Sequence, residues 1–170
     1  MAKTKQRSKT TVRQFRPGDA EEASQVMIEA FRSFLPAKNR KKVLDGFSPA
    51  ALRSTSTFGI KDSSSVCYVA VVDEKVVGYI SGSVNAYGFG TLSVIGVSSR
   101  CFRRGVGSLL MRKMKTFWRK NGMRKVSTCV SAHNSRALVF YLHHGFRPVG
   151  YQRDHFLPGM DEVILDLFFD

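Results

Sequence analysis

Apolar and polar residues alternate with two different periods along the chain, and these periods predict which segments are strands and which are helices. Residues 11–15 alternate at every second position, which predicts a first strand. Residues 16–35 repeat apolar side chains at helical spacing, and we expect Asp19 to cap this helix. Residues 36–48 are rich in Lys and Arg and predict a connecting loop or a broken helix, after which a proline opens a short helix over residues 49–56.

The later part of the pattern predicts most of the sheet. Two β-rich runs within residues 66–84 are joined through Asp73, Glu74 and Lys75, which is typical of a hairpin. A long helix with an apolar face and a basic outer face follows over about Gly105–Asn121. The other predicted elements are a strand over residues 91–97, a strand over 125–131, a short helix between Asn134 and Gly145, and closing strands near 146–153 and 162–168. This order indicates a mixed α/β domain around one central sheet.

Length and composition indicate one ordinary globular domain. The chain has 170 residues, too few for two sizeable cores. We therefore interpret residues 1–10 as a basic flexible tail and residues 11–170 as the folded domain. No apolar run approaches the length that crosses a bilayer, and residues 1–10 lack the apolar block of a secretory signal, so we expect no membrane partner.

The cysteines favour a reducing compartment. Cys67, Cys101 and Cys129 are odd in number and lack the spacing of a metal site. We therefore expect a cytoplasmic protein with free thiols and no metal ion.

Positive charge is concentrated in one part of the chain. The formal net charge is +14, and residues 75–153 hold fourteen Lys and Arg and no acidic residue, whereas the rest is balanced at thirteen of each sign. Such a surface attracts a polyanion, for example a phosphorylated cofactor, RNA or an acidic protein surface, although solubility alone would also explain it. A carboxylate that acts as a base must then come from outside residues 75–153.

Residues 103–110, RRGVGSLL, place two arginines and two glycines at the start of the long helix. The first N–H groups of a helix have no partner within it and carry the positive end of its dipole, and glycines let a ligand approach the backbone. This predicts an anion site, with a tight turn and solvated arginines as the alternative. The P-loop and dinucleotide patterns are both excluded, because neither a Lys followed by Ser or Thr nor a third glycine comes after the second glycine.

The strand TLSVIGV with the corner RRGVGSLL, followed by the helix NSRALVFYLHHGF, resembles the GNAT superfamily of acyl-CoA-dependent N-acetyltransferases. The resemblance runs from about Thr11 to the C-terminus. It implies a single-domain α/β GNAT-like fold, with a central mixed, mostly antiparallel sheet of about seven strands and flanking helices. It also implies acetyl-CoA, the acetylated form of coenzyme A, as the cofactor.

The same resemblance assigns the cofactor site. The family pattern at the corner begins with Gln or Arg, and this chain has Phe102 there, so one side-chain donor is missing. Backbone N–H groups would hold the diphosphate of coenzyme A, with added charge from the arginines. The residues of this glycine corner are Arg103, Arg104, Gly105, Val106, Gly107 and Ser108. A strand splay would leave N–H groups free beside the acetyl group to stabilise an oxyanion, at Ile95, Gly96 and Val97.

The second motif supplies the proton donor that the resemblance implies. Ala137 and Tyr141 share one helix face, and Tyr141 would donate a proton to the departing thiolate, with a space-filling core tyrosine as the alternative. Asn134 is either a cofactor contact or only the cap of its helix.

The catalytic base is not at the position where relatives carry it. Many have Glu or His five residues before the asparagine of the second motif, where this chain has Cys129, and others have Glu near the position of Thr91. A thiol among apolar neighbours is a poor base, because burial raises its pKa. An ordered water is one alternative, and the candidate side chains are His133, His155, Glu29, Asp154 and Asp161. His155, in the loop before the last strand, is the catalytic residue to test first.

Together these motifs predict an acetyl-CoA-dependent N-acetyltransferase that acts by direct transfer in a ternary complex. Residues 145–167 resemble the ribosomal-protein alanine N-acetyltransferase branch, which favours a protein or peptide acceptor, through its α-amine or a lysine, over a small molecule. The basic surface leaves open an anionic or RNA-associated partner. The alternatives are a non-catalytic acyl-CoA-binding module, an acetyltransferase of a small-molecule amine, and an RNA-binding protein. The sequence does not name the acceptor or the oligomeric state.

Overall fold

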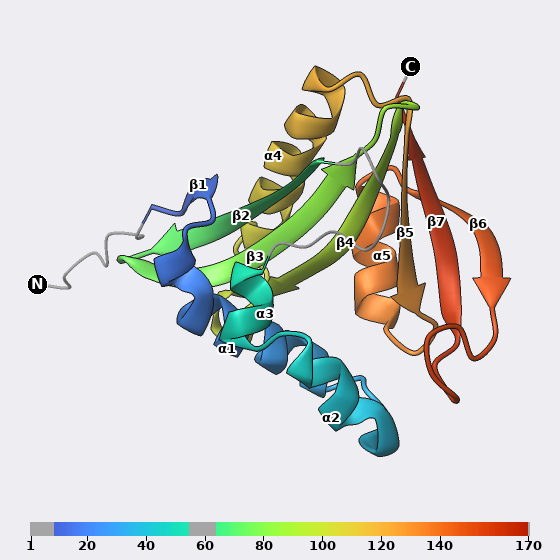
Figure 1. Cartoon of the computed structure of the whole chain (residues 1–170), viewed down its shortest axis with the longest axis horizontal. Helices are drawn as coiled ribbons and strands as arrows, with labels where there is room; N and C mark the ends of the chain where they lie inside the picture. The colour runs from blue at the N-terminus through green and yellow to red at the C-terminus, as the bar shows by residue number, and fades with distance from the viewer. Residues whose placement is uncertain (1–8, 55–63, 170) are drawn as a thin grey trace, which may run out of the picture.

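The computed structural model describes residues 9–54 and 64–169 (Figure 1). Most of the predicted tail over residues 1–10, and the end of the predicted helix over residues 49–56, lie outside the described residues. Among the described residues, no helix is long and apolar enough to span a membrane.

One seven-stranded sheet runs through the described part of the chain, in the order β1-β2-β3-β4-β5-β7-β6. All neighbouring strands are antiparallel except β4 and β5, which are parallel. The predicted mixed, mostly antiparallel sheet is therefore confirmed. The strands are β1 (Thr11–Gln14), β2 (Ser64–Val72), β3 (Lys75–Val84), β4 (Phe89–Val97), β5 (Lys125–Ser131), β6 (Arg147–Gln152) and β7 (Glu162–Phe168).

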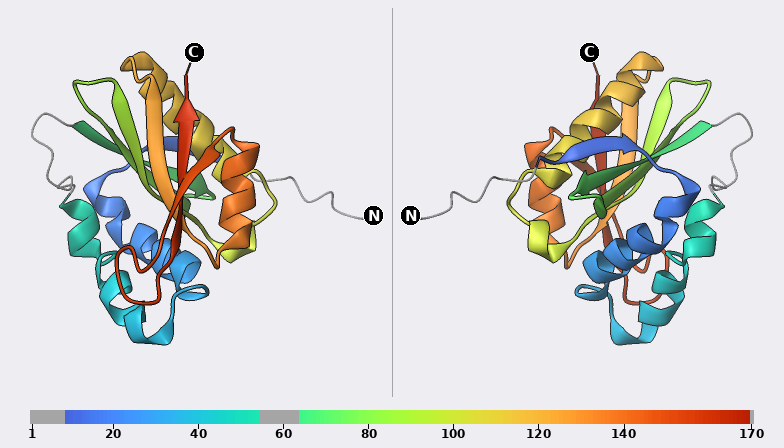
Figure 2. Two further views of the ribbon diagram at one scale, coloured as in Figure 1. Left: turned by 90° about the vertical axis from the view of Figure 1, so that its right-hand side faces the viewer. Right: turned by 90° about the vertical axis from the view of Figure 1, so that its left-hand side faces the viewer.

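Helices cover both faces of this sheet (Figure 2). One face carries α1 (Ala20–Arg32), α2 (Ala37–Asp45) and α3 (Pro49–Arg53), and the other carries α4 (Val106–Lys120) and α5 (Ser135–His143). Because side chains alternate between the faces of a strand, the adjacent residues Val69 and Ala70 belong to different apolar cores. Val69 belongs to the core that includes Met27 of α1, whereas Ala70 belongs to the core that includes Leu110 and Trp118 of α4.

The sheet opens between β4 and β5. The two strands pair only at their starts, where Phe89–Thr91 lie beside Lys125–Ser127, and then diverge (Figure 1). Just beyond the last pair, the hydroxyl of Thr128 donates to the carbonyl of Leu92 at 2.9 Å. The predicted splay between these two strands is thus present.

The segment over residues 36–48, predicted as a loop or a broken helix, contains the regular helix α2. Its lysines and arginines are good helix formers, and it begins directly after Pro36 and ends at Gly46. Lys41 and Asp45 pair one turn apart at 2.9 Å. Asn39, which is buried, anchors the helix by donating to the carbonyl of Pro158 at 2.9 Å.

Asp19 occupies the N-cap position of α1 as predicted, but its side chain makes no capping hydrogen bond to the helix. Its carboxylate instead accepts two hydrogen bonds from the Arg13 guanidinium, at 2.7 and 2.8 Å, and one from the N–H of Arg16 at 2.7 Å. A guanidinium donates two charge-assisted hydrogen bonds to a carboxylate, and together these are stronger than the single hydrogen bond from one helical N–H. The pair ties β1 to the start of α1, and the bond from Arg13 lowers the pKa of Asp19 although burial acts in the opposite direction.

This pair predicts a pH-dependent part of stability. Because the pKa of Asp19 is lower in the folded than in the unfolded chain, the pair stabilises the fold above the unfolded pKa of about 3.9 and loses its effect as the pH falls through the folded value. Asp19→Asn should therefore lower the unfolding free energy at pH 7, and the deficit should shrink below about pH 4.

Urea unfolding of both proteins at pH 7 and pH 3 measures the deficit. Asp45→Asn is the matched control, because its exposed partner Lys41 should contribute little at either pH. A deficit of equal size at both pH values would show that Asp19 does not act through its charge.

Candidate active site

The glycine corner (residues 103–108) has the geometry of an anion site. Gly105 has φ +77°, a left-handed conformation that favours glycine, and no atom lies within 4 Å of the place a Cβ would occupy. The first helical hydrogen bond of α4 runs from the N–H of Leu109 to the carbonyl of Gly105. The N–H groups of Val106, Gly107 and Ser108 thus belong to the first turn, where helical N–H groups have no intrahelical partner. An open backbone with unpaired N–H groups is suited to bind an anion.

Two predicted contacts at this corner have additional roles inside the protein. A Cβ at Gly107 would lie 3.2 Å from the Phe140 ring, so this glycine lets α5 pack against the start of α4. The hydroxyl of Ser108 lies 3.2 Å from Nε2 of His144. Ser108 can therefore offer its backbone N–H to a ligand while its side chain is engaged with α5.

A guanidinium lies next to the residue that departs from the family pattern. Phe102 is 40% exposed, and the Arg136 guanidinium lies over its ring at 4.7 Å from the centroid. Arg136 belongs to the first turn of α5 and is exposed, as are Arg103 and Arg104. The sequence alone does not identify Arg136. The packing of α5 brings this residue to the corner, and no local sequence pattern predicts that contact.

The backbone of β4 directs two of the three predicted N–H groups into the splay. Ser98 donates its N–H to the carbonyl of Val77 in β3 at 2.9 Å. Since hydrogen-bonded and non-bonded pairs alternate along antiparallel strands, Gly96 also faces β3, whereas Ile95 and Val97 point their N–H groups toward β5. Gly96 has a packing role, because a Cβ there would lie 2.6 Å from the sulfur of Met27.

Tyr141 on α5 is buried and lies at the splay. Burial is the main cause that raises the pKa of its phenol, the nearby Cys129 and Glu162 raise it further, and a hydrogen bond with Thr128 acts in the opposite direction. The phenol is therefore protonated at neutral pH and can donate a proton. Asn134 accepts a hydrogen bond from the N–H of Ala137 at 3.2 Å, so it caps α5, the structural alternative for this residue.

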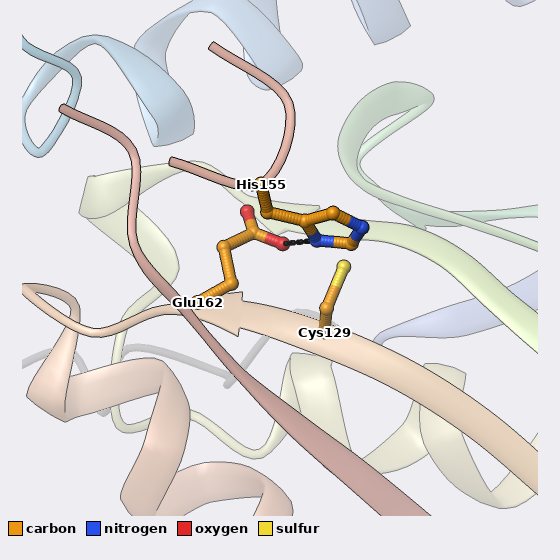
Figure 3. A group of neighbouring side chains, drawn as sticks. All are labelled: Cys129, His155 and Glu162. Atoms are coloured by element: carbon orange, nitrogen blue, oxygen red, sulfur yellow. Dashed lines mark hydrogen bonds and ion pairs between the residues drawn. The ribbon is translucent and has the colours of Figure 1, made fainter. Parts of the chain in front are cut away.

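Three side chains from different elements meet on the face of the sheet opposite α5 (Figure 3). They are Cys129 of β5, His155 of the loop after β6, and Glu162 at the start of β7. Nδ1 of His155 lies 3.2 Å from the carboxylate of Glu162, which is buried. Burial, and next the contact with Glu162, raise the pKa of the Cys129 thiol, so Cys129 is a protonated thiol at neutral pH, in agreement with the expectation that it is a poor base.

Glu162 was missed among the candidate bases. Cys129 faces Ile164 and Ser131 faces Glu162 across β5 and β7, so Cys129 and Glu162 share one face of the sheet. The register brings together Cys129 and Glu162, which are more than thirty positions apart, and no local sequence pattern predicts it. The tautomer that matches this contact has Nδ1–H donating to Glu162 and Nε2 free to accept a proton.

Two other candidate bases, Asp154 and Asp161, stabilise the loop that carries His155. Asp161 accepts hydrogen bonds from the N–H of Asp154 at 2.9 Å and from the hydroxyl of Tyr151 at 2.6 Å, and the bond from Tyr151 lowers its pKa. Asp154 accepts from the N–H of Gly159 in the same loop. These carboxylates order the loop, which also contacts α2 through Asn39.

Glu29 and His133 are not members of this cluster. Glu29 accepts hydrogen bonds from the hydroxyls of Ser98 and Ser99 and from the N–H of Ser99, so its pKa is lowered and it joins α1 to the end of β4. His133 is exposed on the turn before α5.

Comparison with known proteins identifies the family and the fold of the chain. A family model described as "Acetyltransferase (GNAT) family" matches residues 26–146. No curated protein matches the chain. A structure of a PaiA N-acetyltransferase from Thermoplasma acidophilum in complex with coenzyme A is similar over 95% of this chain and 99% of that chain, with a TM-score of 0.76 and 18% identity.

Two further solved structures share the fold. The ribosomal-protein-S18-alanine N-acetyltransferase from Escherichia coli is similar over 94% of both chains, with a TM-score of 0.74 and 18% identity. Ard1 from Thermoplasma volcanium is similar over 95% of this chain and 98% of that chain, with a TM-score of 0.72 and 22% identity.

Proposed function

Because the chain belongs to the GNAT acetyltransferase family and uses acetyl-CoA, we propose that its acceptor is the α-amine of a protein or peptide. The observation that carries the proposal is the His155–Glu162 pair, which lies on the face of the sheet that α5 leaves free. Two proteins of similar fold are the ribosomal-protein-S18-alanine N-acetyltransferase from Escherichia coli and Ard1 from Thermoplasma volcanium, and the name of the first states an acceptor of this class.

The glycine corner is the proposed site for the diphosphate of the cofactor. Its first-turn N–H groups and the positive end of the α4 dipole favour an anion. Arg103, Arg104 and Arg136 add positive charge around it, and Arg136 provides a guanidinium beside Phe102, which cannot donate a hydrogen bond. When bound, acetyl-CoA supplies a thioester carbonyl that an amine can attack.

The N–H groups of Ile95 and Val97 are the proposed oxyanion donors. Both point into the splay, and the rest of the sheet holds them in place before any ligand arrives. Donors that are fixed in advance stabilise developing negative charge without the cost of reorganisation. Gly96 is not one of these donors, since its N–H faces β3.

Tyr141 and His155 have opposite proposed proton-transfer roles. The Tyr141 phenol stays protonated at neutral pH and gives its proton to the departing sulfur. His155 accepts a proton from the attacking amine at Nε2, and Glu162 holds the ring through Nδ1. Glu162 acts as a positioning residue in this scheme.

An α-amine suits this site better than a lysine. Only the neutral amine attacks, and an α-amine has a pKa of about 7.7–8.0 whereas a lysine has a pKa of about 10.4. A single histidine base can deprotonate an α-amine near neutral pH. For a lysine, the same proton transfer is much less favourable, because the pKa of the amine lies further above that of the histidine.

Two short peptides of one sequence test the proposal. The first has a free α-amine and no lysine, and the second has a blocked α-amine and one lysine. We expect acetylation of the first peptide only, measured by mass spectrometry and by thiol release. Acetylation of only the lysine peptide or of only a small diamine would refute the α-amine acceptor, and tight coenzyme A binding without transfer to any amine would indicate a non-catalytic module.

A further inference from the structure

The cluster of Cys129, His155 and Glu162 offers more than a base. One ligand atom from each residue, the sulfur, an imidazole nitrogen and a carboxylate oxygen, lies within 4.8 Å of the other two. We propose that these three side chains form a site for a thiophilic divalent cation, with Zn²⁺ as the best match, and that its occupancy switches off acetyl transfer.

The spacing of the three atoms is close to that around a tetrahedral zinc ion. Ligand atoms at zinc distances of about 2.0–2.3 Å lie roughly 3.3–3.7 Å from one another. Nδ1 of His155 and Oε2 of Glu162 are already 3.2 Å apart. A movement of about 1 Å by the sulfur or the ring would complete the set.

The supporting elements allow that movement without disturbing the fold. Cys129 and Glu162 are fixed on paired strands and point to the same face. The His155 side chain keeps 29% of its surface exposed and stacks on Phe156, which is itself exposed. Two rigid ligands and one adjustable ligand can therefore close around an ion.

The donor atoms select a soft or borderline cation. Thiolate and imidazole ligands suit Zn²⁺, whereas Mg²⁺ and Ca²⁺ prefer sets made only of oxygen atoms. A coordinating thiol loses its proton, so one carboxylate and one thiolate balance the charge of a divalent ion. The exposed side of His155 leaves a fourth position for water, as in zinc sites with three protein ligands.

Metal binding has a direct consequence for catalysis, and this step rests on the proposed function. A cation bound at Nδ1 of His155 and at Glu162 displaces the proton from Nδ1 and leaves the neutral ring protonated at Nε2, so Nε2 can no longer accept the proton of the amine. No local pattern in the sequence indicates the site, because its ligands come from two strands and a loop and do not follow a short spacing.

Metal binding itself is measured first and does not depend on activity. The full-length protein is dialysed against a chelator, titrated with Co²⁺ as a spectroscopic probe, and then equilibrated with Zn²⁺ for metal analysis. We expect one ion per chain and a thiolate-to-cobalt charge-transfer band. Cys129→Ser should abolish the band and weaken Zn²⁺ binding by more than the roughly 10–100-fold typical of a change outside the ligand set.

Two control variants isolate the cluster. Cys101→Ser removes a different buried thiol and His143→Gln removes an exposed histidine, and both should keep the ion and the band. A protein that binds no ion, or a band that survives in Cys129→Ser, would overturn the site.

The switch is measured separately, as acetyl transfer at increasing Zn²⁺. The wild-type rate should fall as the site fills, and whatever rate Cys129→Ser retains should not respond to Zn²⁺. Zinc binding that leaves the wild-type rate unchanged would refute the switch but not the site. Zinc binding by a protein that acetylates no amine would refute the proposed function and leave the site standing.

Discussion

Replacement of Tyr141 by phenylalanine is expected to lower kcat by about 10²–10⁴-fold, the usual contribution of a positioned general acid. The phenol is buried at the β4–β5 splay, and its raised pKa keeps it protonated across the neutral and mildly alkaline range. Phenylalanine keeps the ring that packs against Phe140 and Phe146 and removes only the proton donor.

The form of this loss separates a chemical role from a structural one. A group that acts only in the transition state should lower kcat and kcat/KM by the same factor and leave the KM for acetyl-CoA unchanged. Loss of the hydroxyl and of its bond with Thr128 should cost about 1 kcal/mol of stability, so the variant remains folded. Tyr87→Phe is the matched control, because Tyr87 is 77% exposed on the turn before β4. A Tyr141→Phe enzyme with nearly wild-type kcat would assign Tyr141 to the core alone.

The second large effect is expected for His155→Gln, which should lower kcat/KM for the peptide by about 10²-fold at pH 7. Glutamine keeps a polar side chain in the loop but cannot take a proton at the Nε2 position. The residual activity should rise with pH up to the pKa of the substrate amine, about 7.7–8.0, because the amine must then reach the site already neutral.

The pH profile of the variant is therefore the informative measurement. The exposed His143 provides a control, since His143→Gln removes an imidazole outside the cluster and should leave the profile unchanged. If His155→Gln retained wild-type kcat/KM across the whole range, His155 would not be the base.

Sequence patterns predict the helices and strands that carry the site, but they do not predict the contacts between those elements. The corner at Gly105 and the helix that carries Tyr141 follow from local residues, since a positive φ, a helix start and a cap depend on near neighbours. Arg136 reaches Phe102 only because α5 packs beside the corner, and Glu162 reaches His155 and Cys129 only through the register of β5 and β7.

Two details of the fold differ from the sequence prediction, and both involve contacts outside the local segment. Asp19 looks like a helix cap in its own segment, but the guanidinium of Arg13, fixed in the preceding strand, competes for the carboxylate. The basic residues of α2 suggest a solvated loop, yet Asn39 ties this helix to Pro158, which is far away in the sequence. The Asp19 carboxylate therefore takes a partner from another element, whereas Asn39 adds a distant anchor to a helix that its own residues already favour.

Direct transfer requires that the glycine corner and the cluster of Cys129, His155 and Glu162 open into one continuous site at the splay. The most direct measurement is the calorimetric affinity of a conjugate in which an acetyl bridge joins the α-amine of the peptide to the sulfur of coenzyme A. Since its second half binds as an intramolecular event, we expect it to bind about 10²-fold or more tightly than coenzyme A and to be displaced by either half. A conjugate that binds no more tightly than coenzyme A, and that the peptide cannot displace, would contradict a shared site.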